Sequence, residues 1–326
     1  MKRRAPRSSE VVVFGEAIWD LFPRRAGESV ATRAVDVRHP GGAPANVART
    51  LARLGIATSL VTALGEDALG DGLLTRLRDD GVSVEHVVRL PARTAVTFVD
   101  VARDGARSFL FYRYPSADMQ LESSMLDARA FTAAWLHLGT SSLARSPSRE
   151  ATRRALELAL AAGARISIDV NARRHLWPST EELVCEAMPI VERADVVKVS
   201  EEDLGLLGFS PDVEGGRALH ARRGDGITCL TLAERGAVAW WGNTFYREKA
   251  PRARTVDVTG AGDAFVAGAL STIVRGDPTH REALLRRALS IGCTLGSRAV
   301  TRLGATTALR DLRAVARRAF APLDLR

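Results

Sequence analysis

The sequence has few cysteines and no long apolar run. Its 326 residues contain 3 cysteines, Cys185, Cys229 and Cys293, which are far apart and odd in number. They form neither a Cys-x-x-Cys pair nor a cysteine–histidine spacing, so neither a disulfide framework nor a zinc site organises the chain. The apolar run at 11–14 is too short for the core of a signal peptide, and no stretch approaches the length of a membrane span. These absences predict a cytoplasmic protein with no membrane partner.

Aromatic residues are scarce and do not alternate with basic ones. They make up 6% of the chain, while Lys and Arg outnumber Asp and Glu by 46 to 38, which gives a net charge of +8. A basic balance is compatible with nucleic-acid binding. Here, however, the arginines are scattered, many beside Glu or Asp, and form no basic stripe interleaved with aromatic side chains. We therefore expect no nucleic-acid partner.

Strand and helix patterns alternate along most of the chain. The run at 11–14 is short and β-branched, as expected for a buried central strand. From about residue 131 the order is steadily strand, helix, strand, which predicts a mostly parallel sheet covered by helices on both faces. The expected fold is a three-layer α/β/α sandwich in one domain over residues 10–326, preceded by a loosely ordered basic segment, residues 1–9.

Two segments before residue 131 interrupt this alternation. Residues 94–102 and 107–113 alternate between apolar and polar side chains around Asp104-Gly105, which is a strong hairpin signal. They predict a small, mostly antiparallel sheet formed by about 22–40 and 94–115. Such a sheet would cover the crevice at the strand ends as a lid. A plain edge extension of the main sheet is the alternative.

The segment 255–270 contains a glycine turn followed by an acidic residue. Gly260 and Gly262 allow a sharp turn, and a helix that begins at about Gly262 leaves its first amides without internal partners. Such a helix end binds anions, phosphate above all. Asp263 would repel a phosphate there, unless it takes a proton from a hydroxyl that attacks the phosphate. The alternative is an ordinary helix start with an acidic first turn, and this motif alone leaves the two interpretations equal.

A second glycine turn precedes another predicted helix. Gly41-Gly42 permits a ligand to approach the backbone closely, and the helix that runs from Pro44 to Gly55 places Asn46 in its first turn. Asp20 follows the first buried strand, at the edge where α/β sheets bind ligands. Taken alone, Asp20 is better explained as a residue of a solvated turn.

The two motifs, Gly41-Gly42-Ala-Pro-Ala-Asn46 and Asp257-Val-Thr-Gly-Ala-Gly-Asp263, resemble in this order the two signatures of the ribokinase-like sugar kinases, the PfkB family. The resemblance runs from Val11 to about Leu309. It implies an α/β sandwich with a β lid and the ATP-dependent phosphorylation of a sugar hydroxyl. The segments 111–119, 137–142 and 169–179 are similar to segments of fructokinases, which implies D-fructose as the substrate. The 2-keto-3-deoxygluconate kinases share the Asp-x-Asn-x-Arg pattern and, with ribokinases, remain alternatives.

The resemblance implies a role for each residue that matches the family's motifs. Asp263 would be the general base, and the amides of Gly260, Ala261 and Gly262 would form an anion hole for the transferred phosphoryl group. The residues expected to bind the sugar are Asp20, Gly41, Gly42, Asn46 and Asp263, with Arg113 and Arg173 at the sugar or phosphate site. Those expected to bind the nucleotide are Lys198, Thr231, Glu234, Gly236, Gly260 and Gly262.

The same resemblance implies ATP and Mg²⁺ as cofactors, with K⁺ as an addition that it leaves open. The water shell of Mg²⁺ would contact Asp203. The residues that would hold a monovalent cation are Asp257, Thr259, Ala299, Arg302 and Gly304. The implied partners are the sugar and ATP, and pairing of lid strands between two copies would give a homodimer.

Four positions depart from the family's pattern. Ala233 replaces the first glycine of the nucleotide loop at 231–236, where a positive φ would penalise alanine. Ser200 and Asp203 replace the Asn and Glu of a family motif linked to magnesium, and Ala308 offers no hydroxyl where some relatives place a serine near the cation. The changes at Ala233 and Ser200 raise an alternative function, that of a sugar- or nucleotide-binding regulator that has lost catalysis.

Overall fold

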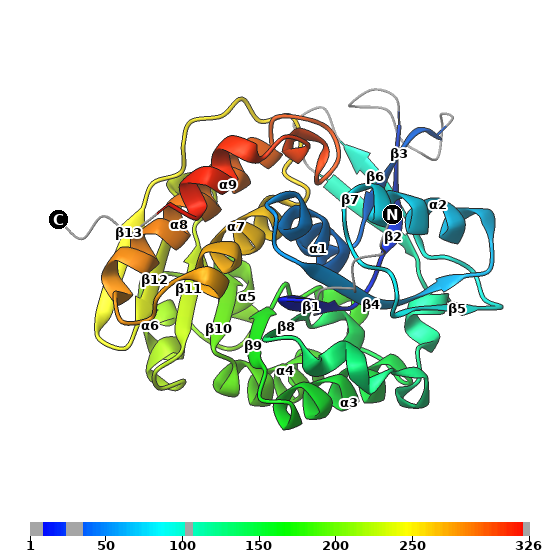
Figure 1. The fold of residues 1–326 in the computed structure, drawn as a ribbon, viewed down its shortest axis with the longest axis horizontal. Coiled ribbons are helices and arrows are strands. Elements are labelled where there is room, and N and C mark those ends of the chain that lie inside the picture. The colour runs from blue at the N-terminus through cyan, green and yellow to red at the C-terminus, as the bar shows by residue number, and fades with distance from the viewer. Residues whose placement is uncertain (1–8, 24–34, 102–106, 322–326) are drawn as a thin grey trace, which may run out of the picture.

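A mostly parallel sheet forms the middle of the molecule (Figure 1). The computed structural model describes residues 9–23, 35–101 and 107–321, and within them this sheet has nine strands. In chain order they are β1 (Val11–Phe14), β4 (Thr58–Gly65), β5 (Val87–Leu90), β8 (Trp135–Gly139), β9 (Arg165–Asp169), β10 (Val196–Ser200), β11 (Ile227–Thr231), β12 (Ala237–Trp241) and β13 (Thr244–Glu248). Their order across the sheet is β13-β12-β11-β10-β9-β8-β1-β4-β5. Neighbours from β11 to β5 are parallel, and β12 and β13 add an antiparallel hairpin at one edge.

Helices cover both faces of this sheet. One face packs against α3 (Ser148–Ala161), α4 (Thr180–Arg193), α5 (Glu201–Leu206) and α6 (Val213–Ala221). The other packs against α1 (Ala43–Arg53), α2 (Ala68–Asp79), α7 (Ala261–Arg275) and α8 (Arg281–Ala299). A last helix, α9 (Arg313–Ala319), lies on α7 and α8. These layers confirm the predicted α/β/α sandwich.

The central strand β1 shows why its sequence is apolar throughout. Successive side chains of a strand point to opposite faces of a sheet. Val11 and Val13 accordingly enter the core on the α1 and α7 side, while Val12 and Phe14 enter the core on the α3 and α4 side. Because both faces are covered, no position of β1 tolerates a polar side chain.

A small second sheet is built from four strands within the described residues. They are β2 (Ile18–Pro23), β3 (Val35–Gly41), β6 (Val96–Val101) and β7 (Arg107–Tyr112), in the order β3-β2-β6-β7. The outer pairs are antiparallel and the β2–β6 pair is parallel. The prediction of a mostly antiparallel separate sheet is therefore confirmed, and the alternative of an edge extension is wrong.

The start of the small sheet differs from its predicted boundary. The chain turns immediately after β1, so β2 begins at Ile18 and not near residue 22. Asp20 consequently lies within a strand, where it pairs with His39, and not in a solvated turn. The predicted hairpin turn at Asp104-Gly105 and the basic start of the chain, residues 1–8, lie outside the described residues.

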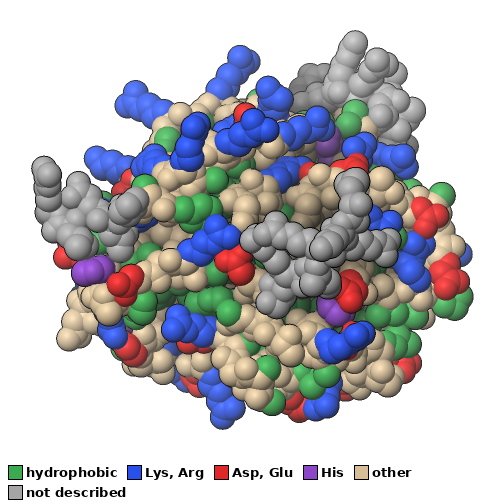
Figure 2. Space-filling view, viewed as in Figure 1, with side chains coloured by type: hydrophobic (Ala, Val, Ile, Leu, Met, Phe, Trp, Pro, Cys, Tyr) green, Lys and Arg blue, Asp and Glu red, His purple; other side chains and the backbone are tan. Residues whose placement is uncertain are grey.

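Basic side chains are spread over the face seen in Figure 2 and are densest along its upper edge, over α8 and α9. Several are neutralised locally, as the sequence suggested: Arg153 contacts Glu186, and Arg281 contacts Asp225. In the part of the chain that the structure describes, every helix is too short or too polar to cross a membrane.

The turn between β11 and β12 shows how the chain accommodates alanine in place of the family's glycine. Ala233 has φ 50°, a conformation that costs an alanine about 1–2 kcal/mol. The turn keeps its shape because Leu232 N–H donates to Gly236 O at 2.8 Å and Gly236 N–H donates to Ala233 O at 3.1 Å. The loop is thus formed, at the expense of local strain.

Replacing Ala233 by glycine should relieve this strain. We expect Ala233→Gly to raise the free energy of unfolding by up to about 1 kcal/mol and Tm by roughly 1 °C, measured by thermal and urea unfolding. The matched control is Ala218, which is also exposed but lies inside α6. Ala218→Gly should lower stability by about 0.5–1 kcal/mol. If both variants lost the same amount of unfolding free energy, Ala233 would not be strained.

Candidate active site

The predicted catalytic residues lie at the first turn of α7. Gly260 has φ 77°, and a Cβ added there would lie 2.4 Å from the Cβ of Ala305, so only glycine fits this turn. The turn places Asp263 next to the first turn of α1. Asn46 Nδ2 donates to Asp263 Oδ2 at 2.9 Å, and both side chains are buried. The two sequence motifs, 217 residues apart, therefore meet directly.

The surroundings of Asp263 favour its protonated form. Burial raises the pKa of this carboxyl to about 6, and the nearby Asp169 charge adds to the effect. The hydrogen bond from Asn46 and the charges of Arg173 and Lys198 act in the opposite direction on the same pKa. A carboxylate with a pKa near 6 is still mostly ionised at neutral pH but is a stronger base than an ordinary aspartate.

Asp20 reaches the same region from the small sheet. A Cβ added at Gly41 would lie 2.1 Å from Asp20 Oδ2, so the glycine lets the carboxylate rest against the backbone. Burial, together with the charges of Asp257 and Asp263, raises the pKa of Asp20 to about 7. Gly42 is the residue just before α1, which carries Asn46. The predicted sugar-binding residues from β2, β3 and α1 are thus brought together beside Asp263.

A buried lysine faces the start of α7. Lys198 Nζ lies 3.2 Å from the position a Cβ would take at Gly262, and it donates to Asp169 Oδ1 at 3.0 Å. Burial alone would lower the pKa of Lys198, but Asp169 and Asp203 outweigh it and raise the pKa. An ammonium group and a helix N-terminus, side by side, form a strong anion-binding site.

Not all three amides of the predicted anion hole are equally available. The N–H of Ala261 donates to Val258 O at 3.2 Å, which is a long bond that an incoming anion could replace. No acceptor for the Gly262 amide lies among the described residues. The geometry therefore supports an anion at this turn, with the Gly262 amide and the Lys198 ammonium as its most accessible donors.

Arg113 belongs to a buried charge network that the sequence did not reveal. Its Nε donates to Asp118 Oδ2 at 2.6 Å and its Nη2 lies 3.4 Å from Glu16 Oε2. Glu16 Oε2 also accepts from Ser141 Oγ at 2.6 Å. Arg113 is therefore neutralised by two carboxylates. Arg113 is thus buried, and it is not a solvated surface arginine.

Three carboxylates of this site were missed as site residues. Glu16 and Asp169 each end a buried strand or follow it directly, which was the signal that singled out Asp20. Asp118 lies in the segment that resembles fructokinases but carries no local signal of its own. Arg173 is exposed and acts at a distance, since its charge lowers the pKa of both Asp20 and Asp263.

The predicted nucleotide and magnesium residues follow β10 and β11. Thr231 Oγ1 donates to Val199 O at 3.3 Å, and Glu234 is exposed in the turn that ends at Gly236. Asp203 and Ser200 form a reciprocal capping box at the start of α5. Asp203 Oδ1 also accepts the amide of Ala172 at 2.7 Å. The serine that departs from the family's pattern thus has a structural role.

The predicted cation residues converge behind the α7 turn. Asp257 is fully buried, and its carboxylate accepts the amides of Thr259 and Gly304, each at 2.7 Å. The carbonyl of Val300, next to Ala299, accepts the amide of Asp257 at 3.1 Å. Arg302 is exposed in the loop that follows. Among the described residues, no group of three or more His, Cys, Asp or Glu is placed to hold a metal ion.

The fold and the site together define a class of protein. A buried carboxylate beside a helix N-terminus and a lysine suits an enzyme that transfers a phosphoryl group to a hydroxyl. The sequence agrees: residues 8–312 match the model of the pfkB family carbohydrate kinases. The chain belongs to this family of carbohydrate kinases.

Similar proteins cover nearly the whole chain. Fructokinase-1 of Oryza sativa subsp. japonica is 41% identical over 312 residues, which span 94% of this chain and 96% of that protein. The crystal structure of fructokinase from Vibrio cholerae O395, in a fructose, ADP and calcium ion bound form, has a TM-score of 0.84 at 33% identity and covers 95% of this chain and 98% of its own. Aminoimidazole riboside kinase from Salmonella enterica, in complex with aminoimidazole riboside and an ATP analogue, has a TM-score of 0.81 at 29% identity, with 95% and 99% covered.

The raised pKa of Asp263 has a consequence for stability. A carboxyl whose pKa rises from 3.8 to about 6 on folding favours the folded state below pH 3.8 and loses that contribution as the pH rises through 6. We therefore expect Asp263→Asn to be more stable than the wild type by roughly 2–3 kcal/mol at about pH 7.5, and by much less at about pH 4.5.

Urea unfolding at the two pH values measures this difference. Asp79 gives the matched control, because it is exposed. Asp79→Asn should leave the stability nearly unchanged at both pH values. An Asp263→Asn variant that is no more stable than the wild type near neutral pH would show that burial does not destabilise the Asp263 carboxylate.

Proposed function

We propose that this kinase is a fructokinase, which transfers the γ-phosphoryl group of ATP to a hydroxyl of D-fructose. The observation that carries the proposal is the placement of Asp263, bound to Asn46, at the N-terminus of α7 beside Lys198. It puts a base and an anion site within one turn of helix. The two fructokinases described above, similar over more than nine-tenths of their length, support fructose as the sugar.

In the proposed reaction Asp263 accepts the proton of the sugar hydroxyl. The hydroxyl oxygen forms a bond to the γ-phosphorus while the bond between that phosphorus and the bridging oxygen breaks, and the electron pair leaves with ADP. The Gly262 amide, the Lys198 ammonium and, after exchange of its bond to Val258, the Ala261 amide stabilise the negative charge of the transferred group. The Gly260 turn holds these donors in place before the substrate arrives.

The electrostatics of the sugar site favour a neutral sugar over a sugar acid. Asp20 and Asp263 are close enough for the charge of Asp263 to raise the pKa of Asp20, and Arg113 is already neutralised by Asp118 and Glu16. A substrate carboxylate would meet the carboxylates of Asp20 and Asp263, while Arg113 and Lys198 are already paired with carboxylates of the protein. Hydroxyl groups, by contrast, can donate to Asp20 and accept from Asn46. This argues for fructose and against 2-keto-3-deoxygluconate.

The nucleotide would lie along the ends of β10 and β11, with Lys198 at its phosphates and Thr231, Glu234 and Gly236 at its other end. Magnesium would arrive with ATP and neutralise phosphate charge. The oxygens of Asp203 already accept bonds from Ala172 and Ser200, so this residue would contact the ion only through water. A monovalent cation such as K⁺ would fit the loop that Asp257 holds.

The proposal includes a homodimer formed through the small sheet. Strand β7 is an edge strand, and its Leu110 and Tyr112 are 55% and 61% exposed. Such an edge can pair with the same strand of a second copy. A cytoplasmic location agrees with the three cysteines, which are all free.

Removing the base tests the catalytic role of Asp263. We expect Asp263→Asn to lower kcat by roughly 10²–10⁴, with little change in sugar affinity, in a coupled ADP-release assay. In the wild type, kcat/KM should rise with pH through about 6, as Asp263 loses its proton. Near-normal kcat in the variant, or a flat profile around pH 6, would remove Asp263 from the role of base.

A substrate panel tests the sugar. The same assay with D-fructose, ribose, 2-keto-3-deoxygluconate and aminoimidazole riboside should give the highest kcat/KM for fructose and the lowest for the sugar acid. Turnover of another sugar but not of fructose would overturn the substrate while leaving the kinase intact. Binding of ATP and sugar by calorimetry without any ADP release would instead favour a regulator.

A further inference from the structure

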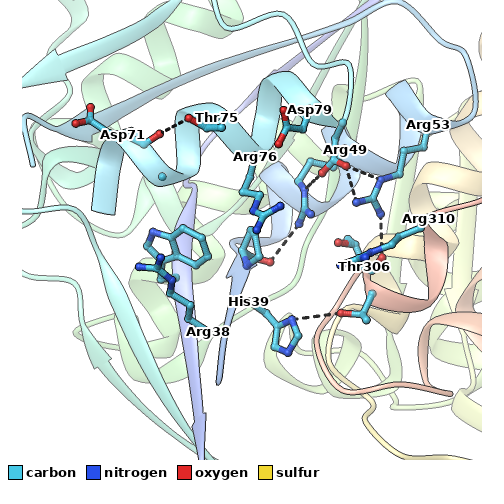
Figure 3. Close-up of a pocket in the computed structure, with 15 residues that line it drawn as sticks. Arg38, His39, Arg49, Arg53, Asp71, Thr75, Arg76, Asp79, Thr306 and Arg310 are labelled. Atoms are coloured by element: carbon cyan, nitrogen blue, oxygen red, sulfur yellow. Dashed lines mark hydrogen bonds and ion pairs between the residues drawn. The ribbon is translucent and has the colours of Figure 1, made fainter. Parts of the chain in front are cut away.

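A second concave site lies between α1, α2, the β2–β3 pair and the loop before α9 (Figure 3). Its volume is about 850 Å³, within the range of about 300–1,000 Å³ that is typical of small-molecule sites. None of the residues that line it belongs to the site around Asp263. It is therefore a separate cavity, and the phosphoryl-transfer reaction gives it no role.

Arginine dominates the charged lining of this cavity. We use the name arginine pocket for the cavity lined by Arg38, Arg49, Arg53, Arg76 and Arg310. They come from β3, α1, α2 and the loop before α9, and Figure 3 shows Arg76 and Arg310 entering from opposite sides. The acidic lining residues are Asp71, Asp79 and Asp80.

The aspartates do not balance these arginines. Asp80 accepts from both Arg49 and Arg53, at 2.5 and 2.7 Å, so one carboxylate serves two guanidinium groups. Asp71 is taken by Arg89, at 2.8 Å, outside the cavity. Within the described residues neither Arg76 nor Arg310 has an ion-pair partner. The cavity therefore holds an excess of positive charge.

Two of the arginines are held rigidly. Arg49 is 5% exposed and donates to Pro40 O at 3.2 Å as well as to Asp80. Arg53 donates to Thr306 O at 2.9 Å. A guanidinium has five N–H donors, so these bonds leave others for a ligand. The cavity thus combines the fixed guanidinium groups of Arg49 and Arg53 with those of Arg76 and Arg310, which have no ion-pair partner among the described residues. Such an arrangement suits a phosphate group, because its oxygens accept hydrogen bonds from several directions.

We propose that the arginine pocket binds a small phosphate-bearing anion. The cavity has room for such a molecule, the charge excess has the right sign, and the fork geometry of arginine suits phosphate. The concave shape, lined by Trp19 and Pro40 on the β2–β3 side, favours a small molecule over an extended polyanion.

The pocket is connected to the catalytic site by two elements. Arg49 and Arg53 follow Asn46 by three and seven positions, so all three residues lie on one side of α1. Arg53 also contacts Thr306, two residues after Gly304, whose amide binds Asp257. A ligand in the pocket would thus touch both the helix and the loop that shape the kinase site.

Calorimetric titration with pyrophosphate tests the proposal. The full-length protein is first saturated with a non-hydrolysable ATP analogue, so that the phosphate-binding turn of α7 is filled. We expect the double variant Arg76→Gln, Arg310→Gln to bind pyrophosphate at least roughly tenfold more weakly than the wild type. Asp79→Asn, which removes the opposing charge, should bind it more tightly, and added salt should weaken binding in every protein.

The control is a double variant with the same loss of charge outside the pocket, Arg78→Gln on α2 and Arg313→Gln on α9, both exposed. It should bind pyrophosphate as the wild type does, and thermal unfolding checks that all variants fold. Three results would overturn the proposal: no pyrophosphate binding by the wild type, equal binding by the two double variants, or binding of duplex DNA but not of pyrophosphate that depends on Arg76 and Arg310. None of these outcomes depends on which sugar the kinase phosphorylates.

Discussion

The hydrogen bond between Asn46 and Asp263 is the contact on which the site depends. It joins the first turns of α1 and α7, and each of these turns is preceded by a glycine that no larger residue could replace without moving its neighbours. Because both helices pack on the same face of the sheet, a shift in either one would separate the base from the sugar-binding residues. The close contact of α7 with α1 thus serves the chemistry as much as the fold.

The site concentrates buried charge, which is unfavourable for folding but useful for proton transfer. The charge of Asp169 acts on Asp263 and the charge of Asp263 acts on Asp20, while burial raises the pKa of all three carboxyl groups. Lys198 is the one buried ammonium group that faces this region in the described part of the chain. The positive charge of Lys198 lies between Asp169 and the α7 turn. It offsets part of the negative charge of the carboxylates, so that a phosphate group can bind beside them. The apolar cores on the two faces of the sheet stabilise the fold and offset the destabilising effect of this buried charge.

The departures from the family's pattern have local structural explanations. Ser200 caps α5 through a reciprocal bond with Asp203, and Ala233 adopts a strained but formed turn. Neither change disturbs the first turn of α7 or its contact with Asn46. The residues around Asp263 therefore do not support the hypothesis that these changes have abolished catalysis.

The sequence alone determined the alternating strands and helices, the two glycine turns and the acidic residue after the second, since all of these are set by local backbone requirements and by the period of apolar residues. Only the tertiary structure decided that Asp20 lies in a strand, that Glu16 and Asp118 neutralise Arg113, and that arginines from four separate segments share one cavity. Apart from the Arg113–Asp118 pair, these groupings join residues far apart in the chain. No local pattern specifies them, because they depend on where the packed layers bring the side chains.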